Sequence, residues 1–233
     1  MDCTLPGRAP APRVRAVVDR VARLGGVELH RSDFDRTRDH WWWRPGWGPG
    51  TRYLTFHLTF EDAPALHAAA ARMGEALQGL RSVDVVPIPW LHLTMTGVGF
   101  AQDVSQVTAA DLVERVFSAA RTLDVTPLRF DRLSLVREAL ALKADSGGWI
   151  GELNGIQVEA IQDVCGVDLG EVAFHPHVSL AYFSGEVDEP GLVRAVEAVG
   201  LHDVAIARPR LSLLELGRDD RVYTWRVVAQ QPL

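Results

Sequence analysis

The chain has 233 residues, a formal net charge of −6, 47% apolar residues and 23% charged residues. A chain of this length can bury a large hydrophobic core without disulfides or metal, and its two cysteines, Cys3 and Cys165, suggest neither a disulfide framework nor a Cys-rich zinc site. Proteins that wrap long nucleic acid need a basic surface, so the negative charge argues against that class. A small phosphate ester or a short RNA end remains compatible with this charge.

No part of the sequence resembles a membrane span or a secretory signal. The apolar runs are all shorter than the roughly 20 residues that a spanning helix needs, and the first residues, MDCTLPGRAPAPR, lack an apolar region before a cleavage site. We therefore expect a soluble, cytoplasmic protein with no membrane partner. We also expect it to be a monomer.

Residues 1–50 are predicted to be an N-terminal extension. It should start with a disordered tail over 1–12, followed by a short amphipathic helix over 14–24, where valines and a leucine recur at helical spacing until Gly25-Gly26. The next stretch, RSDFDRTRDHWWWRPGWGPG over 31–50, combines charges, three consecutive tryptophans and a Gly/Pro cluster. These features favour an ordered loop.

Residues 51–233 are predicted to form the main domain. Its opening strand, YLTFHLTF over 53–60, alternates in the way typical of a sheet that is covered on one face. The further predicted elements are, in chain order, a helix over 65–80, strand material over 83–100, a helix over 109–122, strands over 128–145, a helix over about 150–165, a strand over 174–183, a helix near 190–199 and strands around 208–216 and 222–229. Alternating strands of this kind favour antiparallel sheets with helices on one side.

Two of these strands carry the same short motif, a histidine followed two positions later by a hydroxyl. The motifs are HLTM over 92–95 and HVSL over 177–180. Because side chains two positions apart on a strand point to the same face, each histidine lies beside its hydroxyl. If both strands line one cleft, two imidazoles and two hydroxyls converge on a volume the size of a phosphate group.

Such a set of side chains suits phosphoester chemistry without a metal. Histidine titrates near neutral pH, so one imidazole can act as a general base while the other, protonated, donates to the leaving oxygen. The hydroxyls can hydrogen-bond the phosphoryl oxygens as charge develops on them. A single histidine in a strand is more often a structural residue, but two matching motifs favour a functional pair.

The paired motifs resemble those of the 2H phosphoesterase superfamily, which includes bacterial 2′-5′ RNA ligase-like proteins and cyclic phosphodiesterases. The phrase FHPHVSLA over 174–181 is especially similar to the second motif of that family, and the resemblance extends over roughly residues 52–230. It implies an α+β fold of two lobes, with antiparallel sheets lining a central groove and helices outside.

The resemblance also implies roles for four residues of this chain. His92 and His177 would form the general acid/base pair, and Thr94 and Ser179 would bind phosphate. Serine is an accepted variant of threonine in the second motif.

Two further histidines compete for a role. HLTF over 57–60 also matches the pattern, but in the family the motif strand follows the first helix, so we interpret His57, on the opening strand, as a residue of the groove wall. His175 shares a face with His177, and His-x-His is a common metal-ligand pair, but no nearby Asp, Glu or Cys completes a metal site. We predict no metal or other cofactor, and we place His175 at the rim.

The tryptophan-rich loop could act as a flap on which a base stacks, because aromatic and guanidinium planes are usual base platforms. The alternative, which we prefer, is that its tryptophans pack the extension against the main domain. The residues concerned are Trp41, Trp42, Trp43, Trp47, Arg44 and Arg52. Weaker candidates for substrate contact are Arg137, Lys143, Tyr182 and Tyr223.

The predicted reaction is the opening of a 2′,3′-cyclic phosphate, or transfer at a 2′-5′ phosphodiester, on an RNA end or a nucleotide. Ligation is the same chemistry in reverse, so the sequence leaves hydrolase and ligase open. Two other interpretations also stay open: a catalytically silent module that binds a nucleotide or RNA end, which the intact motifs make less favoured, and a small-molecule metabolic enzyme on the same fold.

Overall fold

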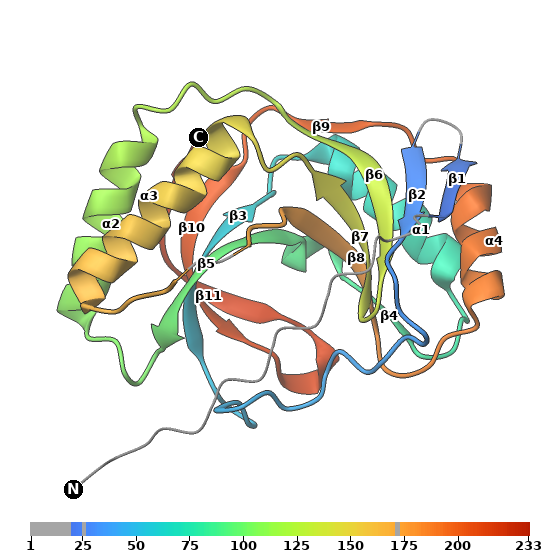
Figure 1. Cartoon of the computed structure of the whole chain (residues 1–233), viewed down its shortest axis with the longest axis horizontal. Helices are drawn as coiled ribbons and strands as arrows, with labels where there is room; N and C mark the ends of the chain where they lie inside the picture. Colours follow the sequence, from blue (N-terminus) through green and yellow to red (C-terminus); the bar gives the residue numbers. More distant parts are fainter. Residues whose placement is uncertain (1–19, 25–26, 171–172) are drawn as a thin grey trace, which may run out of the picture.

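The computed structural model describes residues 20–24, 27–170 and 173–233, so the predicted tail over 1–12 lies outside the described residues. The described strands form one eleven-stranded sheet in the order β1-β2-β6-β7-β8-β5-β3-β10-β11, with β4 paired to β8 and β9 paired to β6 (Figure 1). The strands are β1 (Arg20–Leu24), β2 (Val27–Arg31), β3 (Tyr53–Thr59), β4 (Val83–Val85), β5 (His92–Phe100), β6 (Leu128–Val136), β7 (Ala139–Ala144), β8 (His177–Phe183), β9 (Val204–Ile206), β10 (Arg210–Gly217) and β11 (Thr224–Pro232). The helices are α1 (Pro64–Leu77), α2 (Gln106–Ala120), α3 (Gly148–Cys165) and α4 (Glu189–Val199), with short 3-10 turns η1 (Ile88–Trp90) and η2 (Asp219–Arg221).

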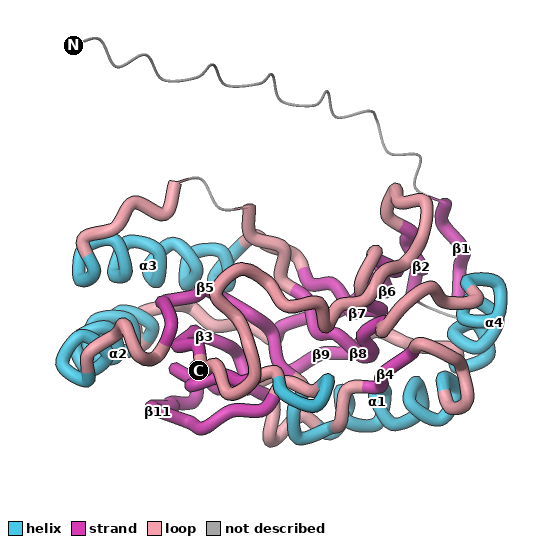
Figure 2. The backbone as a smooth tube through the Cα atoms, turned by 90° about the horizontal axis from the view of Figure 1, so that it is seen from below, coloured by secondary structure: helices cyan, strands magenta, loops and turns pink. Residues whose placement is uncertain are grey.

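The sheet divides into two lobes that meet at β5 and β8. These two strands pair at a single position, Leu93 with Val178. Helices α2 and α3 pack together beside β5 at one end of the molecule, and α1 packs against α4, β8 and β9 at the other end (Figure 2). The predicted α+β class, with two lobes and helices outside, is therefore confirmed, and the two predicted sheets are joined into one.

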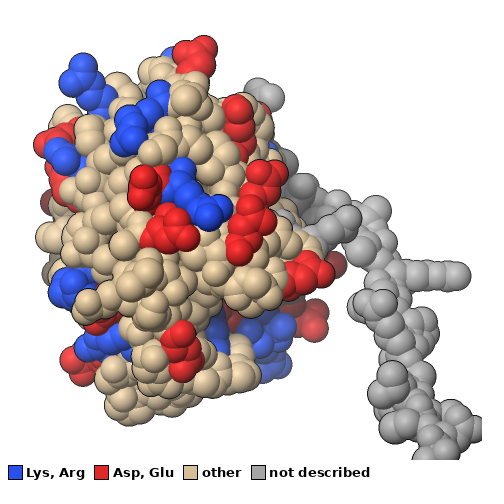
Figure 3. Space-filling model, turned by 90° about the vertical axis from the view of Figure 1, so that its left-hand side faces the viewer, with Lys and Arg blue, Asp and Glu red and all other residues tan. Residues whose placement is uncertain are grey.

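The outer surface at the α2–α3 end carries charges of both signs. Figure 3 views the molecule from this end and shows acidic and basic side chains interspersed among uncharged ones. Neither sign forms a continuous field over the described residues of this face. Such a surface differs from the basic stripe with which proteins follow long nucleic acid.

Among the described strands the pairing is antiparallel except at one place, where β2 runs parallel to β6 with Leu29 opposite Leu133. Through this pair the described part of the N-terminal extension is hydrogen-bonded into the same sheet as the main domain. Each helix in the described ranges is too short or too polar to span a lipid bilayer.

Local sequence explains where the helices begin and which face they bury. Helix α1 starts at Pro64, whose ring suits the first helical turn, and its alanine-rich sequence buries Leu66, Met73 and Leu77 on one face. Helix α2 begins after Ser105, whose side-chain oxygen accepts a hydrogen bond from the backbone N–H of Thr108 at 3.0 Å. These helices bury the apolar side of each lobe and leave the other side of the sheet to form the groove.

The helix predicted over 14–24 is wrong where the structure can test it. Residues 20–24 form strand β1, which pairs antiparallel with β2, while residues 14–19 lie outside the described part of the chain. The spacing of the valines is compatible with a helix, but β-branched residues also favour strands. Because β2 offers an unpaired sheet edge, strand pairing takes precedence over the local helical pattern.

The loop predicted over 31–50 is confirmed for residues 32–50, and it lies against both lobes. The backbone N–H groups of Arg38 and His40 donate to the carbonyls of Arg137 and Phe183, at 2.9 and 2.7 Å, on the β8 lobe. On the other lobe, the N–H of Gly50 donates to the carboxylate of Asp219 at 2.9 Å. The loop is thereby held across the groove between the lobes.

Candidate active site

A pocket of about 600 Å³ lies between the lobes, within the usual size range of small-molecule sites. Side chains of β3, β5, β8 and β10 and of the loop over 32–50 line it. The lining residues are His40, Arg44, Pro45, Trp47, Tyr53, Thr55, His57, His92, Thr94, Gly97, Phe100, His177, Tyr182, Leu216 and Tyr223. The structure therefore brings both motif histidines, which are distant in the sequence, into one cavity.

The two motif histidines are held in the same way. His92 Nδ1 donates to the carbonyl of Trp90 at 2.8 Å, and His177 Nδ1 donates to the carbonyl of His175 at 2.7 Å. In each case the acceptor lies two residues earlier, just before the strand begins. Because a carbonyl can only accept, Nδ1 carries the hydrogen in both rings, and Nε2 of the neutral imidazole is left with a lone pair.

Both motif histidines are biased toward the neutral form. Burial is the main cause that lowers the pKa of His92 to about 4, and the positive charge that His177 would carry lowers it further. Burial also lowers the pKa of His177, with additional contributions from Lys143 and His175. His92 is 6% exposed, whereas His177 is only half-buried, so the two imidazoles differ in access to solvent.

The two motif hydroxyls do not occupy equivalent positions. Thr94 is exposed to the pocket, and its Oγ1 lies 3.0 Å from His57 Nε2. Ser179 is buried, hydrogen-bonds Tyr182 and is not among the residues that line the pocket. The first motif therefore presents its hydroxyl to the cavity, whereas the buried hydroxyl of the second motif does not line it.

His57, expected on the groove wall, lines the pocket beside the first motif. Its ring centroid lies 4.9 Å from that of His92. His57 is 1% exposed, and its Nδ1 has no hydrogen-bond partner among the described residues. Burial, followed by the nearby His92, lowers its pKa well below the usual value, so His57 is a neutral neighbour that orients the Thr94 hydroxyl.

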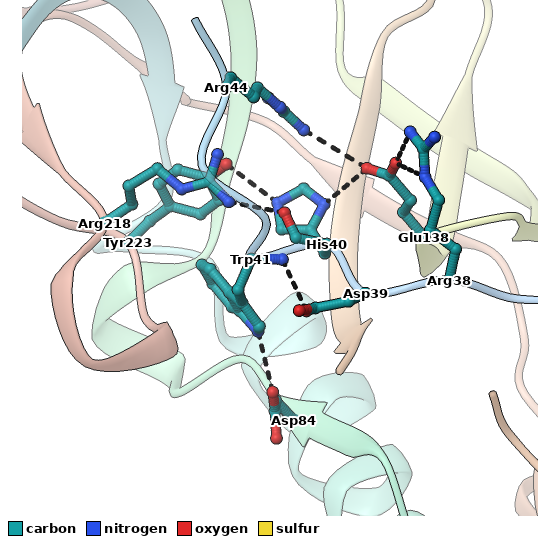
Figure 4. Close-up of polar contacts among 9 residues, drawn as sticks. All are labelled: Arg38, Asp39, His40, Trp41, Arg44, Asp84, Glu138, Arg218 and Tyr223. Carbon is teal, nitrogen blue, oxygen red and sulfur yellow. Dashed lines mark hydrogen bonds and ion pairs between the residues drawn. The ribbon is translucent and has the colours of Figure 1, made fainter. Parts of the chain in front are cut away.

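A second polar group lines the pocket on the side of the N-terminal loop (Figure 4). His40 lies 3.2 Å from a carboxylate oxygen of Glu138 through Nδ1 and 2.9 Å from the Tyr223 hydroxyl through Nε2. Because the carboxylate can only accept, Nδ1 is the protonated nitrogen, and the Tyr223 hydroxyl donates to Nε2. Burial lowers the pKa of His40 to about 3, so this imidazole is neutral and structural.

Some predicted residues lie outside the pocket. Arg137 lines a separate pocket with Ser32, Asp33, Phe34 and Asp35. Trp43 is 47% exposed and is not a lining residue of the main pocket. The side chain of His175 is exposed, and the residue contributes its carbonyl to His177.

The tryptophans of the loop divide between packing and pocket. Trp41 is buried, and its indole N–H donates to Asp84 at 2.8 Å. This contact matches the preferred packing role. Trp47 stacks on Tyr53 with ring centroids 5.7 Å apart and lines the pocket. Gly97 faces this wall, and a Cβ there would come within 3.0 Å of the Tyr53 ring.

The sequence contains no motif that marks His40 or Arg218 as site residues. His40 lies in a charged loop without a repeated motif, and Arg218 follows β10 and does not line the pocket. The only sequence signal was the density of Arg and Trp around residue 40. Among the described residues there is no cluster of three His, Cys, Asp or Glu side chains arranged to hold a metal ion.

Known proteins share both sequence and fold with this chain. No protein-family model matches it. The RNA 2′,3′-cyclic phosphodiesterase of Aeropyrum pernix is 29% identical over 137 residues, which cover 54% of this chain and 70% of that protein. TT0787 of Thermus thermophilus has a TM-score of 0.55 and 16% identity, over 78% of this chain and 97% of that chain.

E. coli LigT has the same fold. Its apo form has a TM-score of 0.51 and 12% identity, over 78% of this chain and 98% of LigT. Its complex with 3′-AMP has a TM-score of 0.50 and 16% identity over the same shares. The resemblance inferred from the paired motifs is confirmed at two levels: the sequence relative is named an RNA 2′,3′-cyclic phosphodiesterase, and the fold is that of TT0787 and LigT.

Proposed function

We propose that this chain is a phosphoesterase that opens 2′,3′-cyclic phosphates on nucleotides or RNA ends, with His92 and His177 as its acid/base pair. The relatives support a phosphoesterase function: one is named an RNA 2′,3′-cyclic phosphodiesterase, and E. coli LigT binds 3′-AMP. The observation that carries the proposal is that both imidazoles line one pocket with Nδ1 bonded to a backbone carbonyl.

The proposed reaction is a single displacement at phosphorus. A water oxygen attacks the phosphorus while one neutral imidazole takes a proton from that water through Nε2. The bond from phosphorus to one ribose oxygen breaks, and the other imidazole, protonated at Nε2, gives its proton to that oxygen. The product is a ribose phosphomonoester, and the pair has exchanged its protonation states.

The hydrogen bonds to the backbone prepare both rings for this exchange. A ring whose Nδ1–H is bonded to a fixed carbonyl cannot rotate freely, so Nε2 keeps its direction through the cycle. The carbonyl also stabilises the imidazolium form by accepting the Nδ1 hydrogen. With the His57 Nε2–H donating to its oxygen, the Thr94 hydroxyl keeps its own hydrogen to donate to a phosphoryl oxygen as negative charge develops.

Substitution of each histidine tests the proposal directly. Wild type, His92→Ala, His177→Ala and the exposed-site control His202→Ala should be incubated with each nucleoside 2′,3′-cyclic phosphate in the presence of EDTA. We expect kcat to fall by about 10²–10⁴-fold in the two motif variants, the usual contribution of general acid/base catalysis, and to stay unchanged in the control.

The outcome distinguishes several alternatives. Turnover that survives both motif substitutions would discard the two-histidine mechanism. Wild-type activity that EDTA removes and a divalent metal restores would point to a metal-dependent enzyme instead. Binding of the product without any wild-type turnover would favour a silent binding module.

A further inference from the structure

The pocket extends well beyond the space that one phosphate group between His92 and His177 requires. Its volume of about 600 Å³ reaches from those histidines to Arg44 on the N-terminal loop. Arg44 belongs to residues outside the family resemblance, and its guanidinium is partly exposed at the pocket wall. The N-terminal extension therefore lines this end of the pocket, which has space for a second group of a ligand.

The charged groups around Arg44 leave an excess of positive charge. Its ion-pair partner in the described chain is Glu138, at 3.4 Å, which is a long contact. Glu138 is already bonded by Arg38 through two guanidinium nitrogens, one of them at 2.7 Å, and His40 beside it is neutral. One carboxylate thus faces two arginines, and Arg38 can keep Glu138 paired if Arg44 turns toward a ligand.

A third arginine adds to this excess from behind the wall. Arg218 is 4% exposed, and its Nε and Nη1 have no hydrogen-bond partner among the described residues. Its Nη2 donates to the carbonyl of His40 at 2.6 Å, and its guanidinium lies over the rings of Trp41, Trp47 and Tyr223 at 5.5, 5.8 and 5.6 Å. This buried cation fixes the loop and raises the local positive potential.

Two nearby carboxylates do not cancel that potential at the pocket wall. Asp39 accepts the backbone N–H of Trp41 at 2.9 Å, and Asp84 accepts its indole N–H at 2.8 Å. Asp84 lines a different pocket, on the far side of the Trp41 ring (Figure 4). Both carboxylates are thus committed to holding the loop and are not lining residues of the main pocket.

The charges at the arginine end act on the tyrosines of the pocket wall. The positive charges of Arg44 and Arg218 act on the pKa values of Tyr182 and Tyr223, which are nonetheless raised by burial. Neither arginine is among the groups that shift the pKa of His92 or His177. An anion at Arg44 would therefore lie on the loop side of the pocket, whereas the phosphate between the histidines lies at β5 and β8.

We propose that Arg44 binds a second phosphate of the substrate, namely the 5′-phosphate of a nucleotide or the phosphodiester on the 5′ side of an RNA terminal nucleotide. The inference rests on the proposed function, and it names the substrate class of the same site. Arginine suits this role because its planar guanidinium binds phosphate oxygens with two parallel hydrogen bonds. The loop contacts hold the backbone around Arg44 in place before the substrate arrives, so only the Arg44 side chain has to reorient on binding, which reduces the entropic cost.

Matched substrates with and without a 5′-phosphate provide the kinetic test. The measured quantity is the ratio of kcat/KM for adenosine 2′,3′-cyclic phosphate carrying a 5′-phosphate to that for the same compound without it. We expect a ratio of about ten or more in wild type, as one charge-assisted phosphate contact implies. This ratio should fall to about one in Arg44→Ala, mainly through a change in KM. It should recover in part in Arg44→Lys, which keeps the positive charge but cannot make two parallel hydrogen bonds.

Arg36→Ala is the matched control, because Arg36 is an exposed arginine of the same loop that pairs with Glu186 away from the pocket. It should leave the ratio unchanged. A wild-type ratio near one would overturn the inference, as would a ratio that Arg44→Ala retains. A fall in the Arg36→Ala variant as large as in Arg44→Ala would also overturn it, because it would indicate a general charge effect.

A binding measurement separates failure of this inference from failure of the proposed function. If wild type turns over neither substrate, the proposed function fails. Calorimetry with adenosine 2′,5′-bisphosphate and adenosine 2′-phosphate then tests Arg44 alone: tighter binding of the bisphosphate by wild type, lost in Arg44→Ala, supports the second phosphate site. Equal affinities of wild type for the two ligands would contradict it.

Discussion

The two motif strands show the same local geometry in different surroundings. On β5 and on β8, the motif histidine donates its Nδ1 hydrogen to the carbonyl two residues before it. His92, however, is buried among His57, Tyr223 and Trp225, with ring centroids 4.9, 5.6 and 5.4 Å away, whereas His177 is half-buried beside Lys143. The motif sets the tautomer, and the packing around each strand sets the pKa and the access of each imidazole.

The largest expected difference between the strands concerns their hydroxyls. Thr94→Val should lower kcat/KM for a cyclic phosphate by about 10–100-fold, the value of one hydrogen bond to a charged group. Ser179→Ala should lower it much less, because Ser179 is buried beside Tyr182 and does not line the pocket. Steady-state kinetics of both variants, with thermal melts to verify folding, check this asymmetry.

Equal losses in the two variants would contradict the asymmetry. They would mean that the Tyr182 side chain moves when substrate binds and releases Ser179 to the phosphate. A crystal structure of the Ser179→Ala variant with a bound product would then identify the rearrangement.

The chemistry of the two motifs could be predicted from the sequence, but the difference in the exposure of their hydroxyls to the pocket could not. Alternation along a strand places Thr94 beside His92 and Ser179 beside His177. Which hydroxyl reaches the cavity depends on what covers it, and Tyr182 comes from the same strand as Ser179 while His57 comes from β3. Contacts between strands follow from register, which a single sequence does not specify.

The N-terminal extension was the least predictable region. Its valine spacing suggested a helix, whereas residues 20–24 pair as a strand at the edge of the sheet. The sequence predicts the loop, but its position across the groove depends on tertiary contacts with Arg218 and Glu138, which lie far along the chain. Long-range hydrogen bonds and ion pairs of this kind leave no periodic signal in the sequence.

The different environments of the two imidazoles also predict the pH dependence of catalysis. The competent enzyme carries one proton on the pair, and its population peaks between the two apparent pKa values. Both values are lowered from 6.5, so kcat/KM, which reports the free enzyme, should be highest below pH 6.5 and fall toward pH 8. The kcat optimum should lie at higher pH, because a bound anionic phosphate raises the pKa of a neighbouring imidazole.

Lys143 allows a test of which histidine the alkaline limb reports. It lies opposite His177 in the β7–β8 pair and lowers the pKa of that histidine. In Lys143→Met the alkaline limb of the kcat/KM profile should therefore move to higher pH. Arg129→Met, which removes an exposed charge from β6, is the control and should not move it. An unshifted limb in Lys143→Met would show that the limb does not report His177.

The smallest expected effect concerns the third histidine, which only the β5 side possesses. The folded-state pKa of His57 is lowered by burial, so the unfolded chain binds more protons than the folded chain below pH 6.5. His57 should therefore make its full contribution to the free energy of unfolding above pH 6.5. That contribution should decrease as the pH falls, by up to about 1.4 kcal/mol per pH unit. Denaturant titrations of His57→Gln between pH 7 and 5 should show a shallower decrease than wild type, whereas the exposed His202→Gln should show the wild-type slope. A wild-type slope in His57→Gln would mean that His57 takes up a proton in the folded state as readily as in the unfolded one, and the polar contact with Thr94 would then have to compensate for its burial.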